Sequence, residues 1–318
     1  MNKNVSLFLD SGAYSAMTQN ISIDIYEYID FIKQNNEYID IYACLDVIGD
    51  PVETYKNQKI MMKHGLNPLI TFHKREDFKW LKKYIEEFDY IALGGISGTG
   101  DSKSYVRQHL DDCWNIICDT KDRLPKIKIH GFGLTALDLM WRYPWYSVDS
   151  TSWVQTGRFG SVYVPKYKQG KYSYDENSLK VAVSNQSPSQ KEEGQHFSTF
   201  SPMEQNQILT YFKEKGFVMG KSDVHKEDKK TYKLKEGERW INSIDAESCR
   251  DLIENTGTYV PSNKLAMRDI VETIIEPGLS NDYRLRDELN IIYFLDLEDA
   301  MPKWPWPFKL SKGKGFDL

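Results

Sequence analysis

The sequence predicts a mixed α/β fold in which strands and helices alternate along the first half of the chain. Short apolar runs recur there, separated by segments whose apolar residues return at the spacing of an amphipathic helix. The chain has 318 residues, 40% of them hydrophobic, which suits one large α/β domain or a barrel with an appendage. Strands that alternate with helices predict a parallel sheet, because each helix carries the chain back to begin the next strand in the same direction.

The predicted strands share a short apolar core that ends in a polar residue or a glycine. They are Val5–Leu9, Tyr38–Leu45, Pro68–Phe72, Tyr90–Leu93, Ile127–Ile129 and Trp145–Val148. The predicted helices share an apolar stripe along one face. They are Ile23–Gln34, Glu53–His64, Glu76–Glu87, Ser104–Asp119 and Leu134–Met140. We expect this alternation to form a TIM-like (β/α)8 barrel, in a shortened or irregular version.

After Pro165 the pattern changes to a polar stretch, Lys166–Lys191, which predicts a β-excursion or an inserted loop. The charged segment Lys221–Arg239 predicts a loop or a hairpin. The helices predicted for this half are Pro202–Lys215, Ala246–Glu254, Asn263–Glu276 and the amphipathic segment Tyr283–Leu295. We therefore assign residues 1–190 to a catalytic barrel core, and residues 191–318 to the rest of the barrel with a helical, basic C-terminal appendage.

The composition limits the partners of the protein. A net charge of −5 gives no general attraction to nucleic acid, so such binding has to use local basic patches. The sequence contains no run of eighteen apolar residues and no signal-peptide pattern, so we expect a soluble, cytoplasmic protein that does not enter a membrane. The cysteines are scattered without paired spacing, which predicts reduced thiols and neither a disulfide framework nor a metal site. They are Cys44, Cys113, Cys118 and Cys249.

Polar residues and glycines follow the predicted strands at the point where each strand ends. They are Asp10, Asp46, His73, Gly94 with Gly95, His130 and Asp149. In a barrel of alternating strands and helices, this edge carries the active site. We therefore expect Asp149 to act as a nucleophile and Asp10, from an earlier strand, to act as its acid/base partner. The alternative for each aspartate is a helix N-cap, which is a common role for a carboxylate after a strand.

The other residues at this edge also have two interpretations. Gly94 and Gly95 permit a flat ligand to approach the backbone closely, or they form a tight turn that needs positive φ. His73 and His130 are either binding residues or structural residues. Four aromatic side chains at strand ends can stack on a base or belong to the core. They are Tyr14, Phe132, Trp145 and Trp153.

Several of these segments, taken in order, resemble the tRNA-guanine transglycosylase superfamily. Asp10-Ser11-Gly12-Ala13-Tyr14 resembles its DSGGFQ motif, and Ala92-Leu93-Gly94-Gly95-Ile96 resembles its ALGGL motif. His130-Gly131-Phe132-Gly133 resembles its HLMGVG turn. Leu45-Asp46 resembles its substrate-binding aspartate, and Asp149 with the segment Thr156–Gly160 resembles its nucleophile and the loop that follows. The resemblance covers roughly residues 5–185.

The sequence departs from the superfamily in three places. Ala13 replaces a glycine of the first motif, and the usual chain has further barrel elements before that motif. The zinc-binding cysteine cluster of the tRNA enzymes is missing, since Cys249 stands alone. A shortened version without zinc most resembles the phage-type 7-deazaguanine DNA transglycosylases, which exchange guanine in DNA for a deazapurine. For a phage protein, the expected location is the cytoplasm of the host cell.

The resemblance implies a double displacement in which Asp149 attacks C1′ of a deoxyguanosine and Asp10 transfers the proton. It also implies a pocket for the base. The residues expected to line it are Ser11, Tyr14, Asp46, His73, Gly94, Gly95 and Phe132. The expected partners are DNA and a free 7-deazaguanine base, with no metal and no cofactor. The phosphate contacts are expected from Arg158, Lys166, Lys168 and Lys171, for which the alternative is a solvated face.

Three other functions stay open at this point. The first is the same exchange on tRNA. The second is a non-catalytic relative that binds nucleic acid, against which the presence of both Asp10 and Asp149 argues. The third is a barrel hydrolase that acts on a nucleoside or a sugar and uses water as the acceptor.

Overall fold

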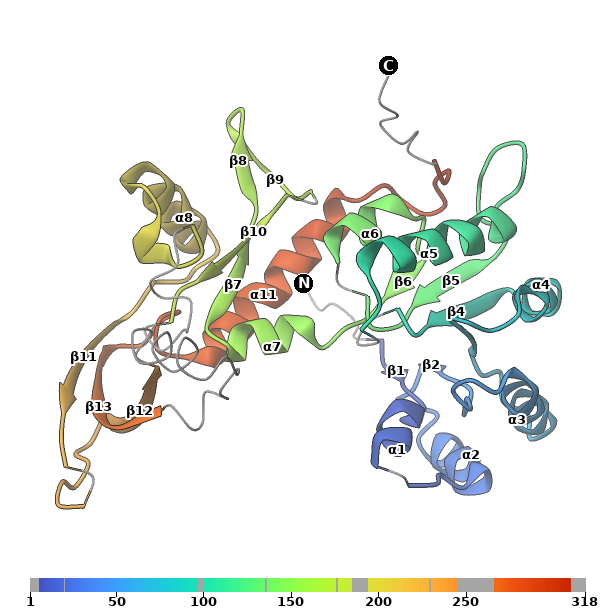
Figure 1. The fold of residues 1–318 in the computed structure, drawn as a ribbon, viewed down its shortest axis with the longest axis horizontal. Helices are drawn as coiled ribbons and strands as arrows, with labels where there is room; N and C mark the ends of the chain where they lie inside the picture. Colours follow the sequence, from blue (N-terminus) through green and yellow to red (C-terminus); the bar gives the residue numbers. More distant parts are fainter. Residues whose placement is uncertain are drawn as a thin grey trace. The chain divides into compact units, whose positions relative to one another are not determined.

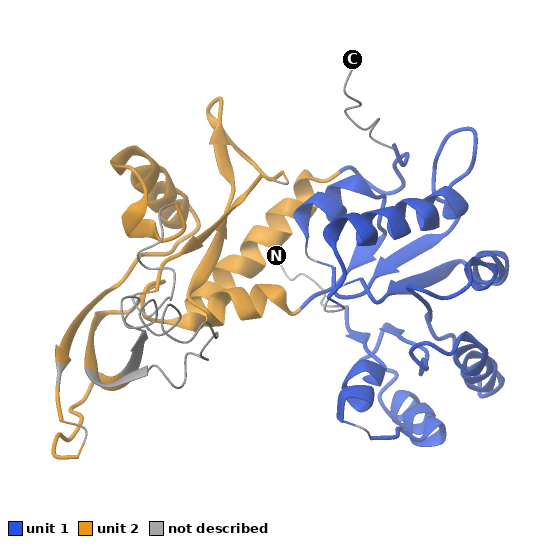
Figure 2. Ribbon diagram, in the orientation of Figure 1, with its two compact units in different colours: residues 1–150, 302–318 blue, residues 151–301 orange. Residues whose placement is uncertain are grey.

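The computed structural model describes residues 6–19, 21–96, 100–134, 136–175, 177–184, 194–228, 230–244 and 266–309. The chain divides into two compact units (Figure 2). Unit 1 comprises Met1–Ser150 and Pro302–Leu318, and unit 2 comprises Thr151–Met301. The boundary predicted at residue 190 falls within residues 185–193, which lie outside the described ranges.

The described residues of unit 1 contain six short parallel strands, which correspond to the six predicted ones (Figure 1). They are β1 (Phe8–Leu9), β2 (Ile41–Tyr42), β3 (Ile70–His73), β4 (Tyr90–Gly94), β5 (Lys128–Gly131) and β6 (Ser147–Val148). β1 pairs with β2, and β3 to β6 form a four-stranded sheet in chain order. A parallel bridge between Ala43 and Leu69 joins the two sheets. The α/β prediction is confirmed, while the described strands form small sheets and no closed barrel.

Four of the described helices of unit 1 begin at a side chain that caps them. The described helices of this unit are α1 (Ala13–Gln19), α2 (Ile25–Gln34), α3 (Pro51–Lys63), α4 (Phe78–Glu87), α5 (Lys103–Ile117) and α6 (Leu137–Arg142). Asp24, Asp50, Asp77 and Ser102 accept hydrogen bonds from the first free N–H groups of α2 to α5. Each such cap contributes about 1 kcal/mol to helix stability. Helix α1 was not predicted from the sequence.

The pairing register gives the four-stranded sheet two different faces. Phe72 lies on one face, where its ring packs against Phe78 of α4 and His109 of α5. The opposite face carries smaller and more polar side chains in register across the strands. They are Thr71, Ala92, His130 and Ser147. The ring of Phe8 in β1 stacks on His130 in β5 with 4.6 Å between the ring centroids, so the first strand lies against the polar face.

The apolar core of unit 1 includes a cluster formed by α2, β2 and α3. Its buried members are Tyr28, Ile29, Ile32, Cys44, Leu45 and Met61. The C-terminal segment also belongs to this unit. Phe308 is 1% exposed there, its ring packs against those of Trp114 and Tyr143, and its N–H donates to the carbonyl of Arg123.

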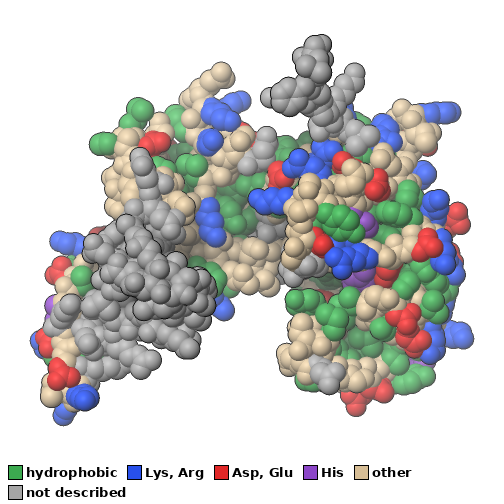
Figure 3. All heavy atoms as spheres, in the orientation of Figure 1, with side chains coloured by type: hydrophobic (Ala, Val, Ile, Leu, Met, Phe, Trp, Pro, Cys, Tyr) green, Lys and Arg blue, Asp and Glu red, His purple; other side chains and the backbone are tan. Residues whose placement is uncertain are grey.

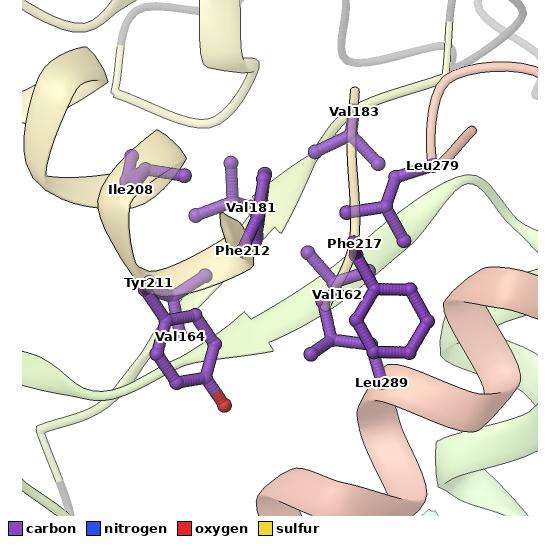
Figure 4. Packing of buried hydrophobic residues seen from close by; sticks show 10 residues of the cluster. All are labelled: Val162, Val164, Val181, Val183, Ile208, Tyr211, Phe212, Phe217, Leu279 and Leu289. Carbon is purple, nitrogen blue, oxygen red and sulfur yellow. The ribbon is translucent and has the colours of Figure 1, made fainter. Parts of the chain in front are cut away.

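Unit 2 combines antiparallel strands with three α-helices in the described residues. The helices are α7 (Ser152–Arg158), α8 (Pro202–Glu214) and α11 (Tyr283–Ala300), with a short 3-10 turn at Phe197–Thr199. The strands are β7 (Ser161–Val164), β8 (Lys166–Lys168), β9 (Lys171–Ser173), β10 (Leu179–Ala182), β11 (Lys221–Lys226), β12 (Glu238–Ile244) and β13 (Ala266–Glu276). Strand β7 pairs with β10, β8 pairs with β9, and β13 lies between β11 and β12. An apolar core cluster of unit 2 joins β7, β10, α8 and α11 (Figure 4). Its buried members are Val162, Val164, Val181, Val183, Ile208, Tyr211, Phe212, Phe217, Leu279 and Leu289.

Two predictions for this half were wrong, and one falls outside the described residues. Residues 263–276 were predicted as a helix, yet Ala266–Glu276 form the central strand β13. The run Ile270-Val271-Glu272-Thr273-Ile274-Ile275 explains this result, because β-branched residues favour strands and β13 has a partner on each side. The predicted loop after Asp149 contains helix α7. The helix predicted at Ala246–Glu254 lies outside the described ranges.

Helix α7 owes its position to close packing against α11. A Cβ atom at Gly157 would overlap the carboxylate of Asp287 on α11, so only glycine permits this approach. The buried Arg286 donates from Nε to the carbonyl oxygen of Gly157 at 2.6 Å. None of the helices in the described ranges is long and apolar enough to cross a membrane.

Candidate active site

The register of the parallel strands brings the predicted site residues to one edge of unit 1. The N–H of Lys74 donates to the carbonyl of Gly94, and the N–H of Phe132 donates to the carbonyl of Leu93. The N–H of Asp149 donates to the carbonyl of Gly131 in the same way. Each bond joins the residues that end neighbouring strands, so their side chains emerge at the same edge.

Asp46 lies at the centre of a buried hydrogen-bond network that joins the first three strands. Its Oδ1 accepts from the hydroxyl of Ser11 at 2.8 Å, and its Oδ2 lies 2.7 Å from Nε2 of His73. The side chains of Asp46 and His73 are 8% and 9% exposed. Gly94 makes room for this arrangement, since a Cβ there would lie 2.7 Å from Nδ1 of His73.

Glu76 extends this network, and sequence reasoning missed it. Its Oε2 accepts from the backbone N–H of His73 at 3.2 Å, while its Oε1 has no hydrogen-bond partner in the described part of the chain. Burial raises the pKa of Glu76 to about 7, even though the charge of His73 lowers it. The sequence predicted only a helix that begins at Glu76. The feature of the sequence that could have indicated this contact is the position of Glu76 three residues after His73.

Asp149 is half exposed and is held through one of its carboxylate oxygens. Its Oδ1 accepts from the backbone N–H of Gly133 at 2.7 Å. The same oxygen lies 3.6 Å from Nε2 of His130, whose side chain is 3% exposed. A half-exposed carboxylate with one fixed oxygen can present its other oxygen to a ligand.

Asp10 follows β1, and the surrounding protein changes the pKa of its carboxyl group. Desolvation by the surrounding protein raises the pKa of its carboxyl group. The backbone N–H of Gly12 opposes this increase, and the negative charges of Asp46 and Asp149 add to it. Asp149 therefore lies close enough to Asp10 for its charge to add to the raised pKa of that carboxyl group.

The remaining predicted base-binding residues lie at the same edge with less defined contacts. Tyr14 is on α1 and 61% exposed, so its ring is not part of the core. Gly95 has a φ of 70°, a conformation that favours glycine, as its tight-turn interpretation predicted. The ring of Phe132 meets that of His130 edge-on, with 4.6 Å between their centroids. Trp145 is 4% exposed and belongs to the core, which leaves it no surface for a base.

The residues predicted to contact phosphates all belong to unit 2. Arg158 ends α7. Burial raises the pKa of Asp287, and the charge of Arg158 opposes this increase. Lys166 is in β8, Lys171 is in β9, and Lys168 forms an ion pair with Asp175. Lysine and arginine side chains are dispersed among acidic and apolar ones on the visible face (Figure 3). These four residues therefore belong to a different unit from Asp10, Asp46, His73 and Asp149.

Two further observations concern ligands and relatives. In the described part of the chain, no group of three or more His, Cys, Asp or Glu side chains is arranged to hold a metal ion. Comparison with known proteins found no match: the chain matches no family model, no curated protein and no solved structure. A functional conclusion therefore depends on the residues of the site and their chemistry.

Proposed function

We propose that this protein is a base-exchange transglycosylase that replaces guanine in DNA with a 7-deazaguanine derivative. The observation that carries the proposal is the pair formed by Asp10 and Asp149, two carboxyl groups that share one site in different environments. A raised pKa favours the acid form of Asp10, and the fixed, half-exposed Asp149 suits a nucleophile. We also infer that the six parallel strands belong to a shortened TIM-like barrel, because they follow one another in chain order and β1 contacts β5.

The first displacement removes the original base. Oδ2 of Asp149 attacks C1′ of the target nucleotide, and the bond from C1′ to N9 of guanine breaks with its electron pair going to the base. The carboxylic acid of Asp10 gives its proton to the departing base and becomes a carboxylate. The product is an ester between Asp149 and the sugar, together with free guanine.

The second displacement inserts the new base. The Asp10 carboxylate takes the proton from N9 of the incoming deazaguanine, and this nitrogen attacks C1′. The ester bond between C1′ and Asp149 then breaks, which restores the Asp149 carboxylate. Asp10 is again a carboxylic acid, so both groups return to their starting states and the two displacements retain the configuration at C1′.

Base recognition in this proposal depends on the buried network. Ser11 and His73 fix the orientation of Asp46, so its remaining lone pairs can accept N–H groups from the base edge. The backbone at Gly94 and Gly95 contacts the same edge, and Phe132 and Tyr14 stack on the ring. A base paired within a duplex cannot reach such a pocket, so the target nucleotide has to leave the base stack.

The test is incorporation of labelled guanine into duplex DNA and into tRNA, followed by denaturing gels for a covalent adduct. We expect incorporation into DNA, loss of adduct and exchange in Asp149→Asn, and loss of exchange with retained binding in Asp10→Asn. Asp138→Asn is the matched control, because this exposed carboxylate pairs only with Arg107 at the surface in the described contacts. Its activity should equal that of the wild type.

Other outcomes identify the alternatives. Incorporation into tRNA alone would assign the reaction to tRNA, and release of base without incorporation would indicate a hydrolase. Binding of nucleic acid without adduct, exchange or release would indicate a non-catalytic relative. An adduct that persists in Asp149→Asn would refute the nucleophile assignment. Mass analysis of nucleosides from DNA of expressing cells would then identify the inserted base.

A further inference from the structure

His130 is a buried residue of β5 that the proposed reaction does not use. Its Nδ1 lies 2.7 Å from the hydroxyl of Ser147 in β6, which in turn lies 2.6 Å from the hydroxyl of Tyr90 in β4. The ring is also fixed by Phe8, which stacks on it, and by Phe132, which meets it edge-on. Three strands and two aromatic rings therefore determine where the other ring nitrogen points.

That other nitrogen, Nε2, is buried and has no hydrogen-bond partner in the described part of the chain. It lies 3.6 Å from Oδ1 of Asp149, slightly beyond hydrogen-bond distance. A buried polar nitrogen without a partner is costly, so its position opposite a carboxylate needs an explanation. Hydrogen bonds in active sites are often long in the free enzyme and shorten when the substrate binds.

Each hydroxyl in the chain from Tyr90 to His130 can donate or accept, so the carboxylate opposite Nε2 decides which ring nitrogen carries the proton. Burial raises the pKa of Tyr90, so its hydroxyl keeps its proton and can donate to Ser147. Ser147 has one proton and passes its own hydrogen bond to Nδ1 of His130. This direction leaves the proton of the neutral ring on Nε2, where it faces the carboxylate. The reverse direction would aim a lone pair of Nε2 at a negatively charged oxygen.

We propose that His130 is a positioning residue for Asp149 that donates from Nε2 to Oδ1 during the reaction. Together with the N–H of Gly133, it makes Oδ1 the fixed oxygen and leaves Oδ2 as the attacking one. Both donors also stabilise the carboxylate that forms again when the ester breaks. This inference rests on the proposed function, because it assigns a partner to the nucleophile of that reaction.

The substitutions His130→Asn and His130→Gln introduce the same amide group at different distances from the backbone. Comparing them distinguishes positioning of Asp149 from a purely structural role of His130. In His130→Asn the amide replaces Nδ1 and can bond to Ser147, but nothing reaches Asp149. In His130→Gln the longer amide reaches the position of Nε2 and can donate to Asp149. Both variants lose the ring that stacks on Phe8, so this loss is common to the pair.

The experiment measures guanine release and adduct breakdown in single turnovers with a deoxyoligonucleotide, alongside the thermal midpoint. A hydrogen bond to a charged group is worth about 1.5–3 kcal/mol, which corresponds to roughly tenfold to hundredfold in rate. We expect a slowing of this size for both steps in His130→Asn, with most of the rate recovered in His130→Gln at a similar midpoint. Equal rates in both variants, or rates that only follow the midpoint, would overturn the inference.

A measurement on the free protein distinguishes failure of the inference from failure of the proposed function. If the wild type forms no adduct and releases no base with DNA or tRNA, the proposed function fails. Nitrogen NMR of the His130 ring still tests the geometry. We expect a proton on Nε2 and none on Nδ1 of the neutral ring, and the opposite tautomer would contradict the hydrogen-bond chain.

Discussion

Carboxyl groups at one edge of unit 1 differ in their burial and in their hydrogen-bond partners. Asp46 is buried with both oxygens hydrogen-bonded, Asp149 is half exposed with one oxygen fixed, and Asp10 has a raised pKa. Glu76 is buried with one oxygen left without a partner in the described part of the chain. The function proposed above uses these differences: Asp46 orients the base, Asp149 is the proposed nucleophile and Asp10 the proposed proton carrier.

Glu76 makes the stability of the protein depend on pH. Its pKa is about 7 in the folded protein against an ordinary value of 4.5, so the folded state keeps a proton that the unfolded chain has lost. Its contribution is therefore fully present below the ordinary pKa and is lost as the pH rises towards the folded value. A difference of this size corresponds to about 3 kcal/mol. We expect the free energy of unfolding to fall more steeply with pH in the wild type than in Glu76→Gln.

Urea unfolding between about pH 4 and pH 8 checks this prediction. The matched control is Glu86→Gln, because Glu86 is an exposed glutamate of helix α4. It should reproduce the pH dependence of the wild type. Identical pH slopes for the wild type and Glu76→Gln would show that Glu76 does not retain its proton on folding.

At the level of secondary-structure elements, strand β4 makes room for the site. Its Gly94, which has no side chain, lies beside His73 of β3. A methyl group at Gly94 would overlap the ring of His73 and the methyl of Thr71, so His73 would have to leave Asp46. We expect Gly94→Ala to lose a charge-assisted hydrogen bond worth about 1.5–3 kcal/mol and to weaken base binding. Chemical unfolding and equilibrium binding of labelled guanine measure the two effects.

Gly49 provides the comparison for that substitution. It has a φ of 85° and open space around its Cα, so Gly49→Ala costs only the backbone strain of about 1–2 kcal/mol. This variant should be destabilised without losing affinity for the base. Equal loss of affinity in the two alanine variants would mean that Gly94 affects stability alone.

At the level of the whole molecule, unit 1 is built from both ends of the chain. Phe308 packs in its core more than 150 residues after the chain has left that unit at Ser150. Removing a buried phenylalanine side chain costs about 3–5 kcal/mol. We expect Phe308→Ala to lower the calorimetric transition of the unit that contains the site by several degrees and to lower exchange activity above that temperature.

Phe159→Ala is the control for this prediction, since Phe159 belongs to unit 2 and is 70% exposed. It should leave every calorimetric transition within about 1 °C of the wild type, because exposed substitutions rarely change stability. An unchanged thermogram for Phe308→Ala would mean that the C-terminal segment does not support unit 1.

The sequence by itself determined the alternation of strands and helices in the first half, and it placed Asp10, Asp46, His73 and Asp149 at strand ends. These features depend on local hydrophobic period and on the chemistry of single residues, which the sequence shows directly. It failed at β13, because pairing on both sides decided between helix and strand there.

Only the tertiary structure decided which partners these residues have. The hydrogen bonds to Asp46 and those from Tyr90 to His130 join residues that are 17 to 57 positions apart in the sequence. The burial that raises the pKa of Glu76 likewise depends on contacts between distant segments. The return of Phe308 to unit 1 is likewise invisible in the local pattern. The physical reason is that desolvation and hydrogen-bond geometry arise from the packing of distant segments, whereas hydrophobic period is a property of neighbours along the chain.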